Sequence, residues 1–110
     1  MQPNDQLELP VFKPAPEQKD IERFVKILHV SMGWMTARQI ESRTGWSDRK
    51  CRALAAASDG QIISGNNGYK HTLHASADEF HEFYGRMTHQ GKEMLARAER
   101  ARRIHHKKVG

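Results

Sequence analysis

The 110-residue sequence predicts a mainly helical α+β fold, with two adjacent short helices, a two-stranded β-hairpin and a long C-terminal helix. Three observations predict it. Residues 36–58 read as two short helices separated by a glycine. Residues 61–73 read as two strands around Gly-Asn-Asn-Gly, which is a strong hairpin signal. Residues 77–105 keep a helical spacing of apolar side chains almost to the end of the chain.

Composition limits the class of protein. Hydrophobic residues make up 37% of the chain and charged residues 28%, which is typical of a globular protein with polar ends. No apolar run approaches the ~20 residues of a membrane-spanning helix, and the N-terminus lacks the basic and apolar regions of a secretory signal. Cys51 is the one cysteine, which excludes a disulfide framework and a cysteine-based zinc site. We therefore expect a cytoplasmic protein.

The net charge is +5, and the charges are unevenly distributed along the chain. Residues 1–22 carry two Lys/Arg against five Asp/Glu, whereas residues 91–110 carry seven against two. An acidic start with a basic end favours a polyanionic partner for the C-terminal part. The alternative is an ordinary solvated surface, because many small basic proteins bind no nucleic acid.

Two segments precede the paired helices. Residues 1–16 hold all four prolines and few apolar anchors, so we expect a disordered or extended N-terminal arm. Within this arm, Leu7–Phe12 could dock on a protein partner or pack against the domain. Residues 17–31 form a predicted helix, whose buried stripe has the i, i+3, i+4, i+7 spacing: Ile21, Phe24, Val25 and Leu28.

The paired helices have clear start and stop signals. Thr36 is the predicted N-cap of the first helix, and Gly45 follows it at the position that favours a left-handed residue. Trp46 is expected to be a buried plug, and Ser47 to cap a second helix from Asp48 to about Ser58. The inner face of that helix carries Cys51, Leu54, Ala55 and Ser58. Its outer face is left basic near the start, which matches the helix-turn-helix plan for DNA binding.

The C-terminal part is predicted to be one long helix. Ser76 and Glu79 form a capping box at the start of this helix. The helix and its basic tail occupy residues 77–110, and the core domain before them occupies residues 17–76. Its apolar stripe is longer than the core of the domain can cover, and a homodimer is the commonest way to bury such a stripe. The expected self-association residues are Met87, Gly91, Met94, Leu95, Ala98 and Ala101. The alternatives are a chain that folds back at Gly91 and a basic end that acts as a flexible tether.

From Gly33 to Phe80 the sequence reads GWMTARQIESRTGWSDRKCRALAAASDGQIISGNNGYKHTLHASADEF. It resembles the winged helix-turn-helix domains of small phage and prophage DNA-binding proteins, most clearly in SDRKCRAL and IISGNNGYK. With the later RMTHQGKEMLARAERARR, the resemblance covers about residues 20–103. It implies a two-stranded β-wing, contact with duplex DNA, a recognition helix at Asp48–Ala56 and a wing tip at Gly65–Gly68. Unlike wings that bind DNA tightly, this wing has an asparagine-rich tip, near which only Lys70 is basic.

Each candidate DNA contact has a physical reason. Arg49 and Arg52 share a helix face near its start, where side chains meet base edges, and arginine can bond both O6 and N7 of guanine. Lys50 is offset by about 100° and better suits a flanking phosphate. Small Ala53 and Ala56 allow close approach. The other candidates are Ser47 for a phosphate, Asn66, Asn67 and Lys70 for the wing, and Arg38 and Arg43 for the DNA backbone. For all of them the alternative is a capping, turn or solvated surface position.

Other chemistries have little support in the sequence. The seven histidines include His71 and His74 near a strand end, but no set has metal-ligand spacing, so no metal or cofactor is expected. No Gly-rich phosphate loop or paired-carboxylate site is apparent, and we expect no enzyme activity. The leading hypothesis is a non-enzymatic double-stranded DNA-binding protein of phage type, acting in transcription regulation or replication. The alternative is a protein-interaction module that binds a host or replication protein.

Overall fold

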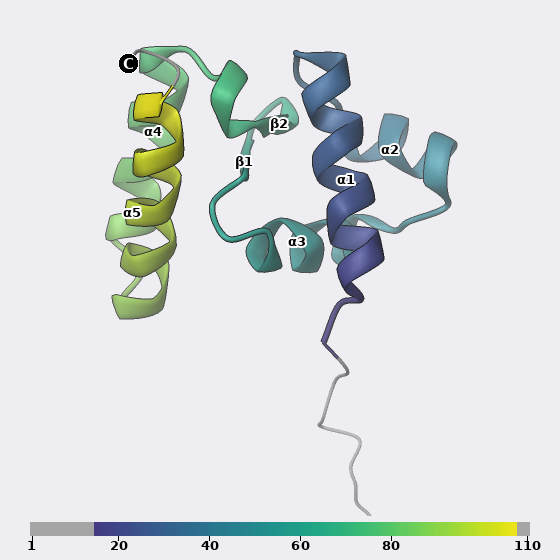
Figure 1. The fold of residues 1–110 in the computed structure, drawn as a ribbon, viewed down its shortest axis with the longest axis horizontal. Helices are drawn as coiled ribbons and strands as arrows, with labels where there is room; N and C mark the ends of the chain where they lie inside the picture. The colour runs from purple at the N-terminus through teal and green to yellow at the C-terminus, as the bar shows by residue number, and fades with distance from the viewer. Residues whose placement is uncertain (1–14, 108–110) are drawn as a thin grey trace, which may run out of the picture.

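The structure is a computed structural model that describes residues 15–107, apart from the side chain of Glu93. It confirms the predicted mainly helical architecture with one two-stranded antiparallel sheet (Figure 1). The elements are α1 (Gln18–Ser31), α2 (Ala37–Thr44), α3 (Asp48–Ala57), β1 (Ile62–Gly65), β2 (Gly68–His71), the 3-10 turn η1 (Thr72–His74), α4 (Ala77–Thr88) and α5 (Lys92–Lys107). The predictions for Leu7–Phe12 and for the last three residues lie outside the described part of the chain.

The start and stop signals of α2 and α3 act as predicted. Thr36 and Gln39 form a capping box at the start of α2, and Gly45 ends that helix with a left-handed φ of 81°. The hydroxyl of Ser47 accepts a hydrogen bond from the backbone N–H of Lys50 and so caps α3. These local signals fix where the two helices begin and end, and hence which side of α3 faces outward.

The hairpin is pinned to the chain just before α2. β1 and β2 pair in antiparallel register, with Gly65 opposite Gly68 around a two-residue turn. Met35 forms an isolated bridge with Tyr69, through two backbone hydrogen bonds of 2.9 Å. Gly68 has a φ of 115°, and a Cβ there would lie 2.1 Å from the carbonyl oxygen of Met35. In this turn it is therefore Gly68, and neither asparagine, that supplies the positive φ.

The sheet separates two apolar clusters. Alternate residues of a strand face opposite sides, so Ile62 joins one cluster and Ile63 joins the other. The first cluster packs α1, α2 and α3 around Phe24. The second packs the other face of the sheet against α4 and α5 around Phe83. Figure 1 shows this arrangement, with β1 and β2 between α1 and the α4–α5 pair.

The single helix predicted from Ala77 to His105 is wrong. The chain leaves α4 at Thr88, passes Gly91 with a φ of 116°, and returns antiparallel as α5 (Figure 1). Gly91 weakens a continuous helix and readily adopts this left-handed conformation. Folding back also lets the stripe bury its apolar area within its own chain. The fold-back at Gly91, one of the alternatives left open by the sequence, is the observed one.

The same fold-back changes the argument for a dimer. Ala98 and Ala101 are 0% exposed, and Met87 is buried with them against the second cluster. Leu95 remains exposed at 42%. Most of the area proposed for self-association is thus covered by the chain itself. Self-association through α5 stays a prediction, but the premise of an unsatisfied stripe no longer supports it.

Candidate nucleic-acid interface

The outer face of α3 presents two arginines, Arg49 and Arg52, beside small side chains. Cys51 and Leu54 are fully buried, and this orientation leaves Arg49, Ala53 and Ala56 exposed. No carboxylate among the described side chains pairs with Arg49. A guanidinium beside two exposed alanines can approach a polyanion closely without first losing a partner.

Arg52 lies in a different environment from Arg49. Its Nε and Nη2 donate to Oδ2 of Asp48, at 3.0 Å and 2.7 Å. The hydroxyl of Tyr69 donates to Oδ1 of the same carboxylate at 2.9 Å. The bonds from Arg52 and then Tyr69 lower the pKa of Asp48, while burial and Asp48 raise the pKa of Tyr69. Arg52 is therefore held toward the hairpin, and the two arginines predicted to read bases together are not equivalent.

Lys50 lies on the opposite side of α3, next to α1. Its Nζ is 3.0 Å from Oδ2 of Asp20 and 5.6 Å from the centre of the Trp46 ring. Arg23 of α1 lies over the same ring at 5.4 Å. The Lys50 side chain is 44% exposed, and the phosphate contact predicted for it at the flank of α3 requires that it leave Asp20.

The structure removes Lys70 from the candidate contacts. In the sheet register Lys70 stands opposite Ile63, so it faces the second cluster and is 9% exposed. Its Nζ lies 2.7 Å from Oε1 of Glu79 and 5.3 Å from the centre of the Trp34 ring. The placement of Lys70 at the DNA-facing edge of the wing is wrong, since strand alternation turns it inward.

A cavity of about 430 Å³ opens between the hairpin turn and the starts of α2 and α3. Exposed Asn66 and Asn67 line it, together with Arg52 and with Arg86 of α4. The Nη2 of Arg86 donates to the carbonyl oxygen of Ser64 at 2.7 Å, which holds the guanidinium beside the hairpin. Sequence reasoning missed Arg86, because only the tertiary fold brings α4 to this edge.

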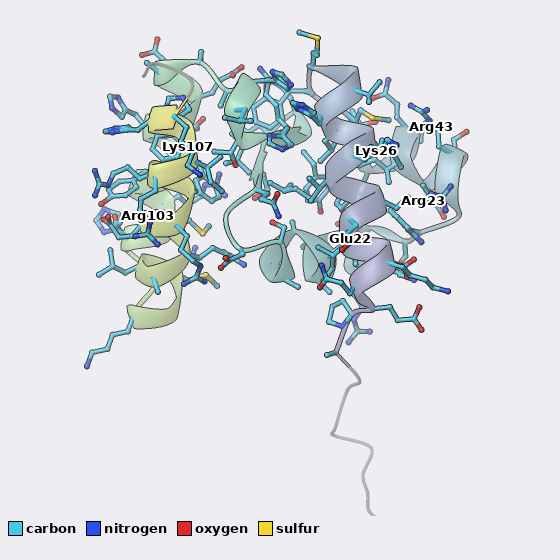
Figure 2. All side chains as sticks on the ribbon, in the orientation of Figure 1. Glu22, Arg23, Lys26, Arg43, Arg103 and Lys107 are labelled. Atoms are coloured by element: carbon cyan, nitrogen blue, oxygen red, sulfur yellow. The ribbon has the colours of Figure 1, made fainter. Side chains whose placement is uncertain are left out.

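The other predicted backbone contacts lie on α2. Arg38 and Arg43 are both exposed. In Figure 2, Arg43 lies on the side of the molecule that carries Arg23 and Lys26 of α1, while Arg103 and Lys107 of α5 lie on the other side. Positive charge is thus presented on both flanks of the molecule.

Three histidines come together away from this interface. The rings of His29, His71 and His74 have centroids 4.8 to 5.8 Å apart. The sequence pointed to His71 and His74 but missed His29, which α1 brings from 42 residues away. Within residues 15–107, no group of three or more His, Cys, Asp or Glu side chains is arranged to hold a metal ion.

Comparison with known protein families, with characterised proteins and with solved structures gives no match. None of the helices in the described part of the chain combines the length and the apolarity needed to cross a bilayer.

Proposed function

We propose that this protein is a non-enzymatic double-stranded DNA-binding protein, in which α3 enters the major groove and the hairpin turn meets the flanking backbone. The proposed role is regulation of transcription or replication, in keeping with the resemblance to winged helix-turn-helix domains of phage type. The observation that carries the proposal is Arg49, which is exposed without an ion-pair partner among the described side chains and lies beside exposed Ala53 and Ala56.

The surroundings of α3 support this proposal. Ser47 is exposed at the start of α3, and helix N-termini attract phosphate. Asn66 and Asn67 are exposed at the turn, and Arg86 adds positive charge beside them. Phosphate contacts from such groups would fix the register of α3 on the duplex, while Arg49 reads a base edge.

A specific observation favours a second candidate, a protein-interaction module. Asp48 neutralises Arg52 and Asp20 neutralises Lys50, so the face around α3 is less basic than its sequence suggests. A surface of paired charges with small side chains is typical of the polar rim of a protein interface. In that case the partner would be a host or replication protein.

Salt-dependent fluorescence anisotropy with a random-sequence duplex distinguishes the two candidates. We expect binding at low salt, with log Kobs falling by about 0.9 per phosphate contact for each unit of log salt. The variant Arg49→Ala should weaken binding, while Arg102→Ala, which also removes one positive charge but on the side of α5 next to α4, should not. Absence of binding to any duplex at low salt would overturn the proposal and favour the interaction module.

A further inference from the structure

Arg97 of α5 is a half-buried cation whose acceptors among the described side chains are two sulfur atoms. Its Nη2 lies 3.0 Å from the sulfur of Met94 and 3.3 Å from the sulfur of Met87. Its Nε is buried and has no hydrogen-bond partner among the residues that the structure describes. Thioethers are weak acceptors, and no carboxylate among the described side chains pairs with this guanidinium. Burial, and then the nearby charge of Arg100, lower its pKa.

The side chain of Arg97 lines two cavities that also border α3, the recognition-helix candidate. A cavity of about 270 Å³ on one side of it is lined by Arg52, Ala56 and Phe83. A second cavity of about 410 Å³ is lined by Ala56, Met94 and Arg100. Because exposed Ala56 borders both cavities, the guanidinium of Arg97 faces the C-terminal half of α3 across a groove with an apolar floor.

Among the described side chains, the charges around this groove leave a positive excess. Arg52 pairs with Asp48 and Arg100 pairs with Asp59, so each has a carboxylate. Arg97 is the third guanidinium and has none among the described side chains. A cation held partly out of water costs free energy, which an anion from outside can recover. A guanidinium is planar and always charged, and it is the side chain best suited to recognise phosphate.

We propose that Arg97, aided by Arg100, binds a phosphodiester group of the DNA strand that flanks α3; this site rests on the proposed function. The source of the phosphate follows from the placement of the groove. α3 and the turn between α4 and α5 lie at the same end of the molecule (Figure 1), and Arg103 and Lys107 continue the positive charge along α5 (Figure 2). A strand leaving the major groove beside Ala56 therefore passes Arg97 first. α5 thus acts as a phosphate clamp beside the recognition helix.

The test compares Arg97→Met with Arg102→Met in duplex binding. Both changes remove one charge from α5, but Arg102 pairs with Glu99 on the side of α5 next to α4. We expect Arg97→Met to lower affinity for a random-sequence duplex roughly tenfold at low salt and to reduce the log–log salt slope by about 0.9. The Arg102→Met control should keep the wild-type slope. Arg97→Lys, which retains the charge, should keep most of the slope and serves if Arg97→Met fails to fold.

A second measurement needs no DNA. Inorganic phosphate, compared with chloride at equal ionic strength, should raise the thermal unfolding temperature of the wild-type chain and of Arg102→Met more than that of Arg97→Met. The reason is that only an intact site binds the anion. If the wild type binds duplex and Arg97→Met keeps the same log–log salt slope, the phosphate clamp is overturned and the proposed function is unaffected. If the wild type binds no duplex, both proposals fail. Binding to poly-glutamate in place of DNA would then identify the groove as a site for an acidic protein segment.

Discussion

The ammonium group of Lys70 lies 2.7 Å from Oε1 of Glu79, and this ion pair joins β2 to the first turn of α4. The same carboxylate accepts a hydrogen bond from the Trp34 indole at 2.8 Å and one from the backbone N–H of Ser76 at 2.9 Å. Glu79 therefore caps α4 and also links it to the hairpin and to the segment before α2. One side chain fixes how the C-terminal helices sit against the sheet.

This arrangement predicts a strong effect of Glu79→Gln on stability. The Lys70 ammonium, with the Ser76 and Trp34 N–H groups, lowers the pKa of Glu79 from 4.5 to about 2. A carboxylate whose folded-state pKa is depressed contributes stability above its unfolded pKa, and this contribution is lost as the pH falls from about 4.5 toward 2. We expect Glu79→Gln to cost on the order of 2 kcal/mol at pH 7 in urea unfolding, and much less near pH 2. Exposed Glu82→Gln is the matched control; an equal loss in both variants would contradict the assignment.

A second pH effect belongs to His71. Burial, with smaller effects of His29 and His74, lowers the pKa of His71 from 6.5 to about 4. Because the folded chain resists protonating this ring, the stability it supports is complete above pH 6.5 and declines as the pH falls to about 4. The loss should be on the order of 3 kcal/mol across that window.

The variant His71→Asn isolates this effect. The backbone N–H of Leu73 donates to Nδ1 of His71 at 3.1 Å, and the asparagine oxygen can take over that bond. Unfolding free energies measured from pH 4 to 7 should then show a flatter dependence than in the wild type. Exposed His81→Asn should keep the wild-type profile. A wild-type profile in His71→Asn would show that another group titrates in this window.

Two glycines in the C-terminal half should respond to alanine with opposite signs. Gly91 has a φ of 116° in the turn between α4 and α5, and alanine there should lower stability by about 1 kcal/mol. Gly85 lies inside α4, and a Cβ added there would meet no neighbouring heavy atom within 4 Å, so alanine should raise stability by about 0.5–1 kcal/mol. Thermal or urea unfolding of the two variants decides this. A stabilising Gly91→Ala would favour one continuous helix over the observed hairpin.

The inequality of Arg49 and Arg52 leads to a prediction about specificity. With a duplex selected from a random pool, Arg49→Ala should cost roughly 1–3 kcal/mol of binding free energy and reduce discrimination against a changed base pair. Arg52→Ala should cost less, because Asp48 already holds that guanidinium toward the hairpin. Competition assays with cognate and random duplexes measure both effects. A larger loss of discrimination for Arg52→Ala would show that Arg52 leaves Asp48 to read the base.

Self-association is testable through Leu95. With Ala98 and Ala101 buried inside the chain, Leu95 is the large apolar side chain of α5 that remains most exposed. If α5 mediates a dimer, sedimentation equilibrium should show concentration-dependent mass for the full chain, and Leu95→Asp should abolish it. A full chain that stays monomeric at high micromolar concentration removes the dimer prediction.

Local features of the fold could be predicted because the residues that decide them are neighbours in the sequence. The caps at Thr36, Ser47 and Ser76 act on backbone N–H groups three residues away, and the structure has all three. Gly45 ends α2 by its own φ angle. The periodicity of α3 likewise decided which of its residues face inward, and with them the exposed position of Arg49.

Contacts between distant segments could not be predicted in this way. The inward position of Lys70 depends on the α4 carboxylate of Glu79 packing beneath the sheet. Arg97 faces Ala56 only because the chain reverses at Gly91. Periodicity reports that a helix face is apolar but not what covers it, and the same stripe fits a dimer or a fold-back equally well. The sequence by itself therefore determined the first three helices, the hairpin and the start of α4, with their caps and buried faces, because these depend on short-range bonding and spacing. Only the tertiary structure decided which side chains share a surface, because that depends on how the two clusters pack against the opposite faces of one small sheet.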